Sequence, residues 1–276
     1  MTELEPYAVR LRRRFALKAP ICVGLDPHPA LLRAWGLSVD PAGLARFGAI
    51  VVEALADRVA CLKPQSAFFE AHGAAGLAVL EETMAQARQA GALVVLDVKR
   101  GDIGSTMTAY AEAYLGDGPL AGDAVTLSPY LGFGALSPAL DLAEANGRGV
   151  YLLVRTSNPE GGLIQSAVTA DGVSVAQSLV DAAAQRNRSS GLDAVGLVLG
   201  ATHADLGVDL SGFSGSVLAP GVGAQGGSLA GARRLLAGCE GPILPALSRQ
   251  ILRAGPDRDG LRAELDRLLE SDRPAD

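Results

Sequence analysis

Residues able to do acid–base chemistry are most concentrated in the segment LDVKRGDIGST, residues 96–106. Asp97, Lys99 and Asp102 lie there within six positions, between the apolar run GALVV and the helix-like TMTAYAEAYL. Asp97 and Lys99 are two positions apart, so a strand directs both side chains to one face. Asp102 lies beyond a glycine turn, and strand geometry does not decide where it points. Because burying idle charges costs several kcal/mol per ion, this crowding predicts chemistry at a strand end.

Eight short apolar or β-branched runs are the elements that must position these residues. They cover residues 21–25, 59–63, 93–98, 123–127, 150–154, 194–199, 216–220 and 242–247. Helical stretches rich in alanine and leucine alternate with them, at 42–57, 73–90, 134–146, 171–187, 227–238 and 258–270. Continuous apolarity is typical of parallel strands covered on both faces. Eight such units predict an α/β fold, a (β/α)8 barrel, with a doubly wound open sheet as the competing architecture.

No linker rich in proline and serine divides the 276 residues, so we expect one domain. It comprises an N-terminal helical extension at 1–20, the barrel at 21–270 and a tail at 271–276. The basic run RLRRR at 10–14 is interpreted as the solvated face of the first helix.

Composition excludes several classes of function. The net charge of −6 argues against a nucleic-acid surface, and no apolar run approaches the roughly 18 residues of a membrane span. Cys22, Cys61 and Cys239 are odd in number and show no CxxC spacing. Two of them lie in strand-like runs, which favours reduced, buried thiols and a cytoplasmic protein.

In a barrel, chemistry takes place at the carboxyl ends of the strands. The sequence has Asp26 after the first predicted strand, Lys63 after the second, and Asp97 with Lys99 in the third. For a single Asp–Lys pair, a salt bridge that merely closes the barrel is an equally good interpretation. Two lysines and three aspartates on one rim favour a working site, because unneeded buried charge is costly.

Glycine and arginine residues follow the last two predicted strands. The stretch GVGAQG at 221–226 has GxGxxG spacing after the seventh strand, and Arg249 follows the eighth. A dinucleotide site is disfavoured, because that fingerprint belongs in a first βαβ unit with a ribose-binding acid downstream. In barrels, the loops after strands seven and eight bind phosphate through backbone N–H groups, and an arginine fork suits the same ligand. This end is therefore predicted to bind a phosphate monoester.

In combination these motifs resemble a known family. DVKRGDIGST fits D-x-K-x-x-D-I-x-x-T, and with PGVGAQGG and a late Ser-Arg it resembles orotidine 5′-phosphate decarboxylase. LSPYLGFGAL at 127–136 and the loop RTSNPEGG at 155–162 are similar to the longer bacterial branch, type 2. The resemblance extends from about Asp26 to Arg249. Leu247 departs from the usual small residue before Ser-Arg, which we expect to affect local packing only.

The resemblance implies decarboxylation of orotidine 5′-phosphate to uridine 5′-phosphate, without cofactor or metal, in de novo pyrimidine biosynthesis. It implies that Asp26 binds ribose hydroxyls and that Lys63 bridges the ribose to the carboxylates. Asp97 would lie against the substrate carboxylate, and Lys99 would donate the proton to C6.

Further implied contacts complete the site. The enzyme would be an obligate homodimer whose sites are completed across the interface, by Asp102, Ile103 and Thr106 of the other subunit. The remaining implied contacts are Ser157 and Pro220 with the pyrimidine, and Gly223, Gln225 and Arg249 with the phosphate, under a lid at 221–227.

Two alternatives stay open. Sugar-phosphate decarboxylases and aldolases of the same superfamily use Mg²⁺ and carry a metal-binding glutamate at the end of strand two, where this chain has Lys63. A barrel that only binds a phosphorylated metabolite would gain little from Lys99 among acids. His28, His72 and His203 lack HxxxH or HxH spacing, so no metal site is predicted. We interpret His72 and His203 as surface residues at helix starts and His28 as a loop residue near the rim.

Overall fold

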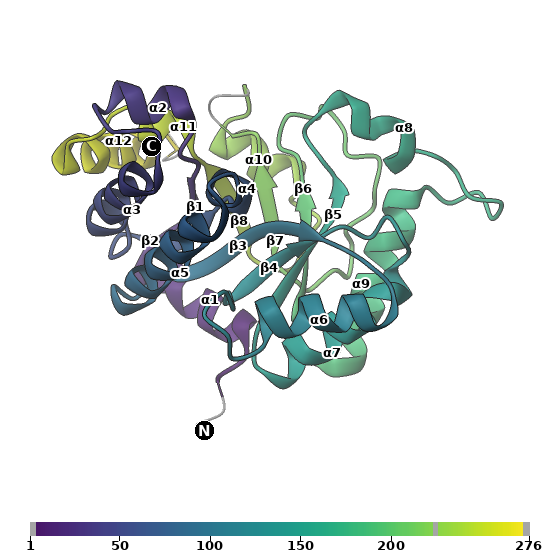
Figure 1. The fold of residues 1–276 in the computed structure, drawn as a ribbon. Coiled ribbons are helices and arrows are strands. Elements are labelled where there is room, and N and C mark those ends of the chain that lie inside the picture. The colour runs from purple at the N-terminus through teal and green to yellow at the C-terminus, as the bar shows by residue number, and fades with distance from the viewer. Residues whose placement is uncertain (1–3, 223–225, 273–276) are drawn as a thin grey trace.

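The structure is a computed structural model that describes residues 4–222 and 226–272. Eight parallel strands close into a barrel in chain order, which confirms the predicted (β/α)8 architecture (Figure 1). The strands are β1 Ala19–Leu25, β2 Val59–Pro64, β3 Leu93–Arg100, β4 Ala124–Leu127, β5 Gly149–Arg155, β6 Val195–Leu199, β7 Val217–Pro220 and β8 Ile243–Leu247.

Helices surround the barrel. The longer ones are α1 Tyr7–Leu17, α3 Pro41–Leu55, α5 Gly73–Gln89, α6 Gly104–Leu115, α7 Ser137–Ala145, α9 Val175–Ser190, α10 Leu229–Leu235 and α12 Arg258–Ser271. Shorter ones are α2 Pro29–Ala34, α4 Ser66–Glu70, α8 Gly162–Gln165 and α11 Arg249–Leu252, with 3₁₀ turns η1 Phe133–Leu136 and η2 Pro159–Gly161. Within the described ranges, no helix is both long and apolar enough to cross a membrane.

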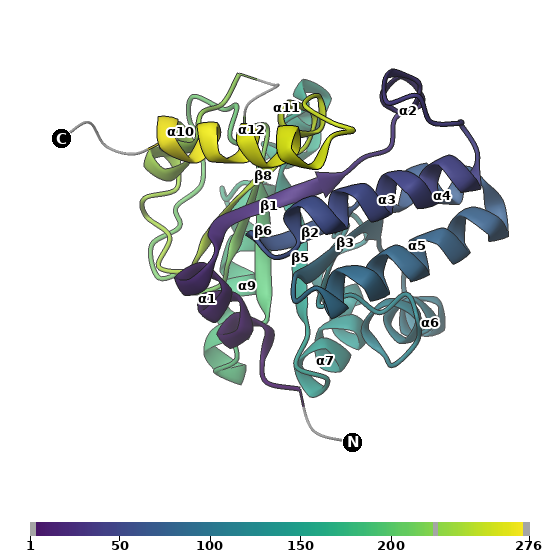
Figure 2. The same cartoon turned by 90° about the vertical axis from the view of Figure 1, so that its left-hand side faces the viewer.

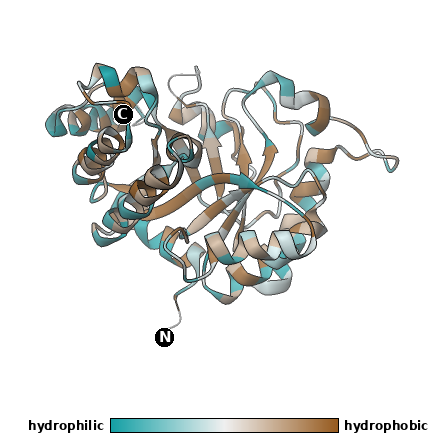
Figure 3. Cartoon of the chain, viewed as in Figure 1, coloured by the Kyte–Doolittle hydropathy of each residue, from teal (hydrophilic) through white to brown (hydrophobic). Residues whose placement is uncertain are grey.

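The strands are apolar because both of their faces are covered. Every residue of β2, β4 and β6 is buried, and Figure 3 shows hydrophobic colour along the strands and hydrophilic colour on the outward sides of the helices. Side-chain caps fix where several helices begin. Asp40 accepts a hydrogen bond from the Gly43 amide at the start of α3, and Ser174 caps α9 in the same way.

The sequence-based elements differ from the structure mainly in their short segments. Strand β1 begins at Ala19, two residues before the expected start of the barrel at 21. The four short helices were not expected from the sequence. Between β6 and β7 the chain forms an irregular segment instead of a helix, and the buried side chains of Leu206, Leu210 and Phe213 cover the barrel there.

Helix α1 lies under the amino-terminal end of the barrel, opposite α2 and α11 (Figure 2). The prediction of a solvated basic face is wrong for half-buried Arg10 and Arg14. Arg10 pairs with Asp123, and Arg14 donates to the carbonyl oxygen of Val59 at 2.6 Å. Arg12 is exposed as expected. The basic run therefore attaches the helix to the strand starts.

Candidate active site

A cluster of alternating charges lies at the carboxyl ends of β2 and β3. The Lys63 Nζ is 2.9 Å from Asp97 Oδ2, and the Lys99 Nζ is 2.6 Å from Asp97 Oδ1. Asp26, directly after β1, lines the same cavity of about 520 Å³. The structure thus brings together the four charged residues that the sequence assigns to the first three strand ends.

The cluster holds Asp97 as an anion. Its burial opposes ionisation, but the two adjacent ammonium groups outweigh the burial and hold the pKa of Asp97 well below its usual range. Burial likewise opposes the charge on Lys63, yet Asp97 and Asp26 raise the pKa of that lysine above its usual value. The site therefore keeps a buried carboxylate between two cations at neutral pH.

Two further side chains bind Asp97, and sequence reasoning missed both. Gln65 Nε2 donates to Oδ2 at 2.9 Å, and Thr126 Oγ1 donates to Oδ1 at 2.7 Å. Gln65 directly follows β2 and is two residues beyond Lys63, so the same spacing that relates Asp97 to Lys99 could have identified it. Thr126 is a hydroxyl residue inside the otherwise apolar β4, which is a weaker signal.

Lys99 has an unusual backbone. Its φ of 46° is in the left-handed region, which costs a residue with a Cβ about 1–2 kcal/mol. The β3–β4 ladder is irregular here, because it passes from the pair Leu96–Val125 to the pair Arg100–Leu127. Strain of this kind persists where the surrounding contacts over-determine it, and such positions cluster at functional sites.

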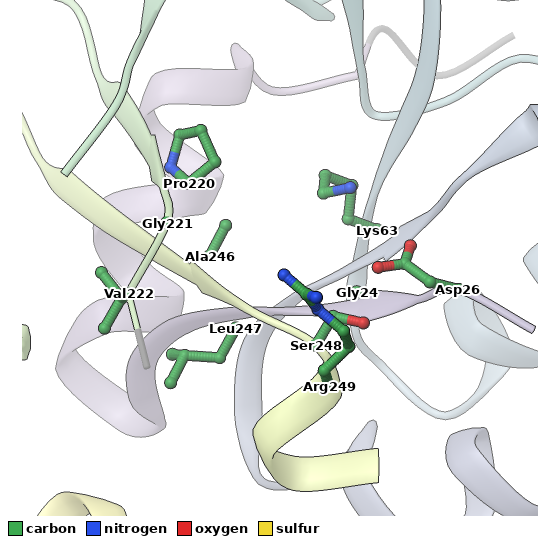
Figure 4. Close-up of a pocket in the computed structure, with 10 residues that line it drawn as sticks. All are labelled: Gly24, Asp26, Lys63, Pro220, Gly221, Val222, Ala246, Leu247, Ser248 and Arg249. Carbon is green, nitrogen blue, oxygen red and sulfur yellow. The ribbon is translucent and has the colours of Figure 1, made fainter. Parts of the chain in front are cut away.

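A second, smaller cavity of about 130 Å³ adjoins the charge cluster (Figure 4). The ends of β7 and β8 line it through Pro220, Gly221, Ser248 and Arg249, and the Arg249 side chain extends over it. Gly221 has a φ of 97°, a conformation that favours glycine. The predicted contacts Gly223 and Gln225 lie outside the described residues.

Two residues that line this cavity carry unpaired polar atoms. Asp26 Oδ1 and Ser248 Oγ are buried and, within the described part of the chain, have no hydrogen-bond partner. Gly24 leaves room for both residues, because a Cβ there would lie 2.9 Å from Ser248 Cβ and 3.1 Å from Asp26 Oδ2. Buried polar groups are normally paired, so orphans that line a cavity indicate a ligand site.

The loop after β5 forms another wall of the larger cavity. Ser157 lies there as expected from the sequence, beside Thr156. Gln165 of α8 holds Thr156 at two points, since its Oε1 accepts from the Thr156 amide at 3.0 Å and its Nε2 donates to the hydroxyl at 2.8 Å. His203 was expected to start a helix, but it lies in the irregular β6–β7 segment with Nε2 2.9 Å from the Thr156 carbonyl oxygen.

The other two histidines lie at helix starts. His72 directly precedes α5, as expected. His28 directly precedes α2 and packs edge-on against Phe68, with 4.3 Å between the ring centroids. Among the described residues, no three of the His, Cys, Asp and Glu side chains are grouped to hold a metal ion.

Three of the predicted contacts do not join the cluster within this chain. The carboxylate Oδ1 of Asp102 accepts from the Ile103 amide at 2.8 Å, and the Ile103 side chain is 62% exposed. Thr106 is exposed on α6. These residues belong to the loop and helix that follow β3, outside the cavity lined by Asp97 and Lys99.

Comparison with known proteins decides the family. The sequence model of the orotidine 5′-phosphate decarboxylase / HUMPS family matches residues 19–263. The chain belongs to this family. It is 55% identical to the orotidine 5′-phosphate decarboxylase of Salinispora arenicola over 274 residues, which cover 99% of each chain. The Streptomyces coelicolor enzyme is 53% identical with the same coverage.

A solved structure extends the likeness of this family member to three dimensions. A Streptomyces avermitilis crystal structure assigned to orotidine 5′-phosphate decarboxylase superposes with a TM-score of 0.92 at 51% identity. The match covers 98% of this chain and 95% of that one. The resemblance seen in the sequence motifs is thereby confirmed over nearly the whole barrel.

Proposed function

We propose that this family member decarboxylates orotidine 5′-phosphate to uridine 5′-phosphate in de novo pyrimidine biosynthesis, using no cofactor. The observation that carries the proposal is the Lys63–Asp97–Lys99 cluster, with a carboxylate fixed 2.6 Å from an ammonium group at the cavity floor. The family relatives that are more than 50% identical to this chain are named for the same activity.

The chemistry explains why a lysine is held beside a carboxylate. Loss of CO2 breaks the C6–carboxylate bond and leaves the electron pair on C6, where the pyrimidine ring delocalises it poorly. A fixed cation must therefore stabilise the developing charge, and a proton must complete the step. The Lys99 ammonium supplies both, and solvent then reprotonates its amine.

Asp97 raises the free energy of the bound substrate. A substrate carboxylate about 4 Å from Asp97 is destabilised by about 4 kcal/mol at an effective dielectric constant near 20. The repulsion disappears as neutral CO2 departs, so it lowers the barrier to the transition state. Lys63 balances the charge of Asp97 and keeps it ionised at neutral pH.

Binding energy comes from the rest of the nucleotide. Asp26 takes the ribose hydroxyls on its unpartnered Oδ1, and Lys63 bridges the ribose to the carboxylates. Ser157 and Pro220 contact the pyrimidine. Arg249 holds the phosphate with backbone amides near Gly223 and with Gln225, and the 221–227 loop closes over it. Contacts remote from C6 hold the substrate carboxylate against Asp97.

The active unit is a homodimer in which Asp102, Ile103 and Thr106 of one subunit complete the site of the other. Apolar side chains exposed on the loops after β3 and β4 support this interface, among them Ile103 at 62%, Tyr130 at 74% and Leu131 at 52%. The free cysteines and the proposed metabolic role support a cytoplasmic location.

The test is direct. Metal-free protein in EDTA is mixed with orotidine 5′-phosphate, and the ultraviolet absorbance of the substrate is followed. We expect steady loss of the substrate absorbance and formation of uridine 5′-phosphate. No turnover in EDTA, with activity on a sugar phosphate restored by Mg²⁺, would support the aldolase alternative. Binding without turnover under any condition would leave a phosphometabolite-binding barrel.

A further inference from the structure

The hydroxyl of Thr126 lies between the side chain of Asp97 and the main chain of Lys99. It donates to Asp97 Oδ1 at 2.7 Å and accepts from the Lys99 amide at 3.0 Å. Asp97 Oδ1 also accepts from the Lys99 Nζ at 2.6 Å. These three hydrogen bonds close a ring that contains both ends of Lys99, and Thr126 is the one member from another strand.

The irregular ladder explains why this amide needs such a partner. Between the pairs Leu96–Val125 and Arg100–Leu127, strand β3 contains two more residues than β4. Lys99 lies in this bulge with its φ of 46°, so its N–H leaves the regular ladder and bonds to the Thr126 side chain instead. Thr126 is 1% exposed, so water does not substitute for its hydroxyl.

A threonine hydroxyl has a single hydrogen, which here is committed to Asp97. Its oxygen is then directed at the Lys99 amide, so both bonds depend on one side-chain rotamer. This rotamer therefore fixes the position of the Asp97 carboxylate, which is to oppose the substrate carboxylate, relative to Lys99, which is to protonate C6.

We propose that Thr126 is a positioning residue that sets the geometry of the Asp97–Lys99 pair. The role rests on the proposed function, since both partners act on the reacting carbon there. Thr126 itself is almost fully buried at the wall of the cavity and acts through these two residues. Its loss misplaces groups that the transition state needs and leaves the ribose and phosphate contacts intact.

The test removes the hydroxyl without changing the shape. We expect Thr126→Val to lower kcat about 100-fold, the size of effect that a displacement of about 1 Å causes, with KM within about threefold of wild type. Thr126→Ser keeps the hydroxyl and should retain kcat within about threefold. If valine is not accommodated, Thr126→Ala removes the same hydrogen bonds with a smaller side chain.

A second measurement separates positioning from general damage. If Lys99 protonates C6, microscopic reversibility requires it also to exchange the C6 hydrogen of uridine 5′-phosphate with solvent deuterium, which NMR follows without decarboxylation. This exchange should slow in Thr126→Val in parallel with kcat, while the Kd for uridine 5′-phosphate stays unchanged. Thr83→Val is the matched control, because the hydroxyl of this buried threonine donates to the Val79 carbonyl oxygen of its own helix and bonds to no other described residue. It should keep wild-type rates.

The outcomes separate the two proposals. An inactive wild-type protein refutes the proposed function and this role with it. An active wild type whose Thr126→Val variant keeps its kcat and exchange rate refutes the role of Thr126 alone. A rise in KM at constant kcat, or equal damage in the serine and valine variants, overturns it as well.

Discussion

The amino-terminal and carboxyl ends of the barrel both bury side-chain oxygens, and the two ends pair these oxygens differently. Under the barrel, Ser216 donates to the Tyr151 hydroxyl at 2.8 Å, and that hydroxyl lies 3.0 Å from the hydroxyl of Tyr7. At the carboxyl end, Asp26 and Ser248 have buried oxygens without partners in the described chain. The first arrangement is closed, and the second is open toward a cavity.

Both ends also contain a residue other than glycine with a positive φ. At the carboxyl end, Lys99 lines the open cavity, whereas at the other end Asp193, shortly before β6, is paired with Arg12 of α1. Paired polar groups contribute to stability, and buried polar groups left unpaired beside a cavity indicate a ligand site. Mutations at the two ends should therefore change different observables.

The largest effect is expected at the carboxyl end, from Lys99→Ala. Removing the fixed cation and the proton donor together should lower kcat by at least about 10⁴-fold. The protein should remain folded, because Lys99 is partly exposed, and should still bind uridine 5′-phosphate, as calorimetry can measure. A variant with more than a trace of activity would show that another group protonates C6.

Next in size is the test of the shared site. Asp102→Asn and Lys99→Ala homodimers should each be nearly inactive. Mixing equal amounts through reversible dissociation should restore roughly a quarter of wild-type activity, because about half of the dimers are mixed and each has one of two sites intact. Subunit exchange is verified by native mass spectrometry. No recovery after verified exchange would place Asp102 in its own barrel.

A smaller effect is expected at the phosphate cavity. Arg249→Ala should raise KM by about 1.5–3 kcal/mol, or roughly 10- to 150-fold, with kcat affected less, because a charged hydrogen bond to the substrate is lost. Arg188→Ala, which removes an exposed arginine of α9, is the control and should change KM little. An unchanged KM for Arg249→Ala would mean that the phosphate binds elsewhere.

The barrel and the position of its site could be predicted from the sequence because both depend on local patterns. Continuous apolar strands define the parallel sheet, and charged residues directly after them mark the rim. The short helices were missed because segments such as α8 and α11, of four residues each, carry too few residues for a periodic signal. The burial of Arg10 and Arg14 was not predicted, because the groups that they bind, on Asp123 and Val59, are distant in sequence.

Within the site, the sequence predicts the contacts that follow from residue spacing along a single strand. Asp97 and Lys99 share a face by spacing, and they do contact each other. The bulge and the positive φ of Lys99 depend on the register between β3 and β4, which no single strand encodes. Thr126 was missed for the same reason, since its role exists only once the two strands are paired.

The last prediction concerns the closed network under the barrel, where activity should not change at all. Tyr7→Phe removes the hydroxyl of a residue that is 2% exposed, and it leaves the hydroxyl of fully buried Tyr151 short of one partner. An unsatisfied buried group costs about 1–3 kcal/mol, so the midpoint of thermal unfolding should fall by several degrees. Ser189→Ala is the control, because it removes an exposed hydroxyl of α9, and it should unfold like wild type. If Tyr7→Phe instead lowered kcat while leaving stability unchanged, the two ends of the barrel would be coupled, and the division between them would fail.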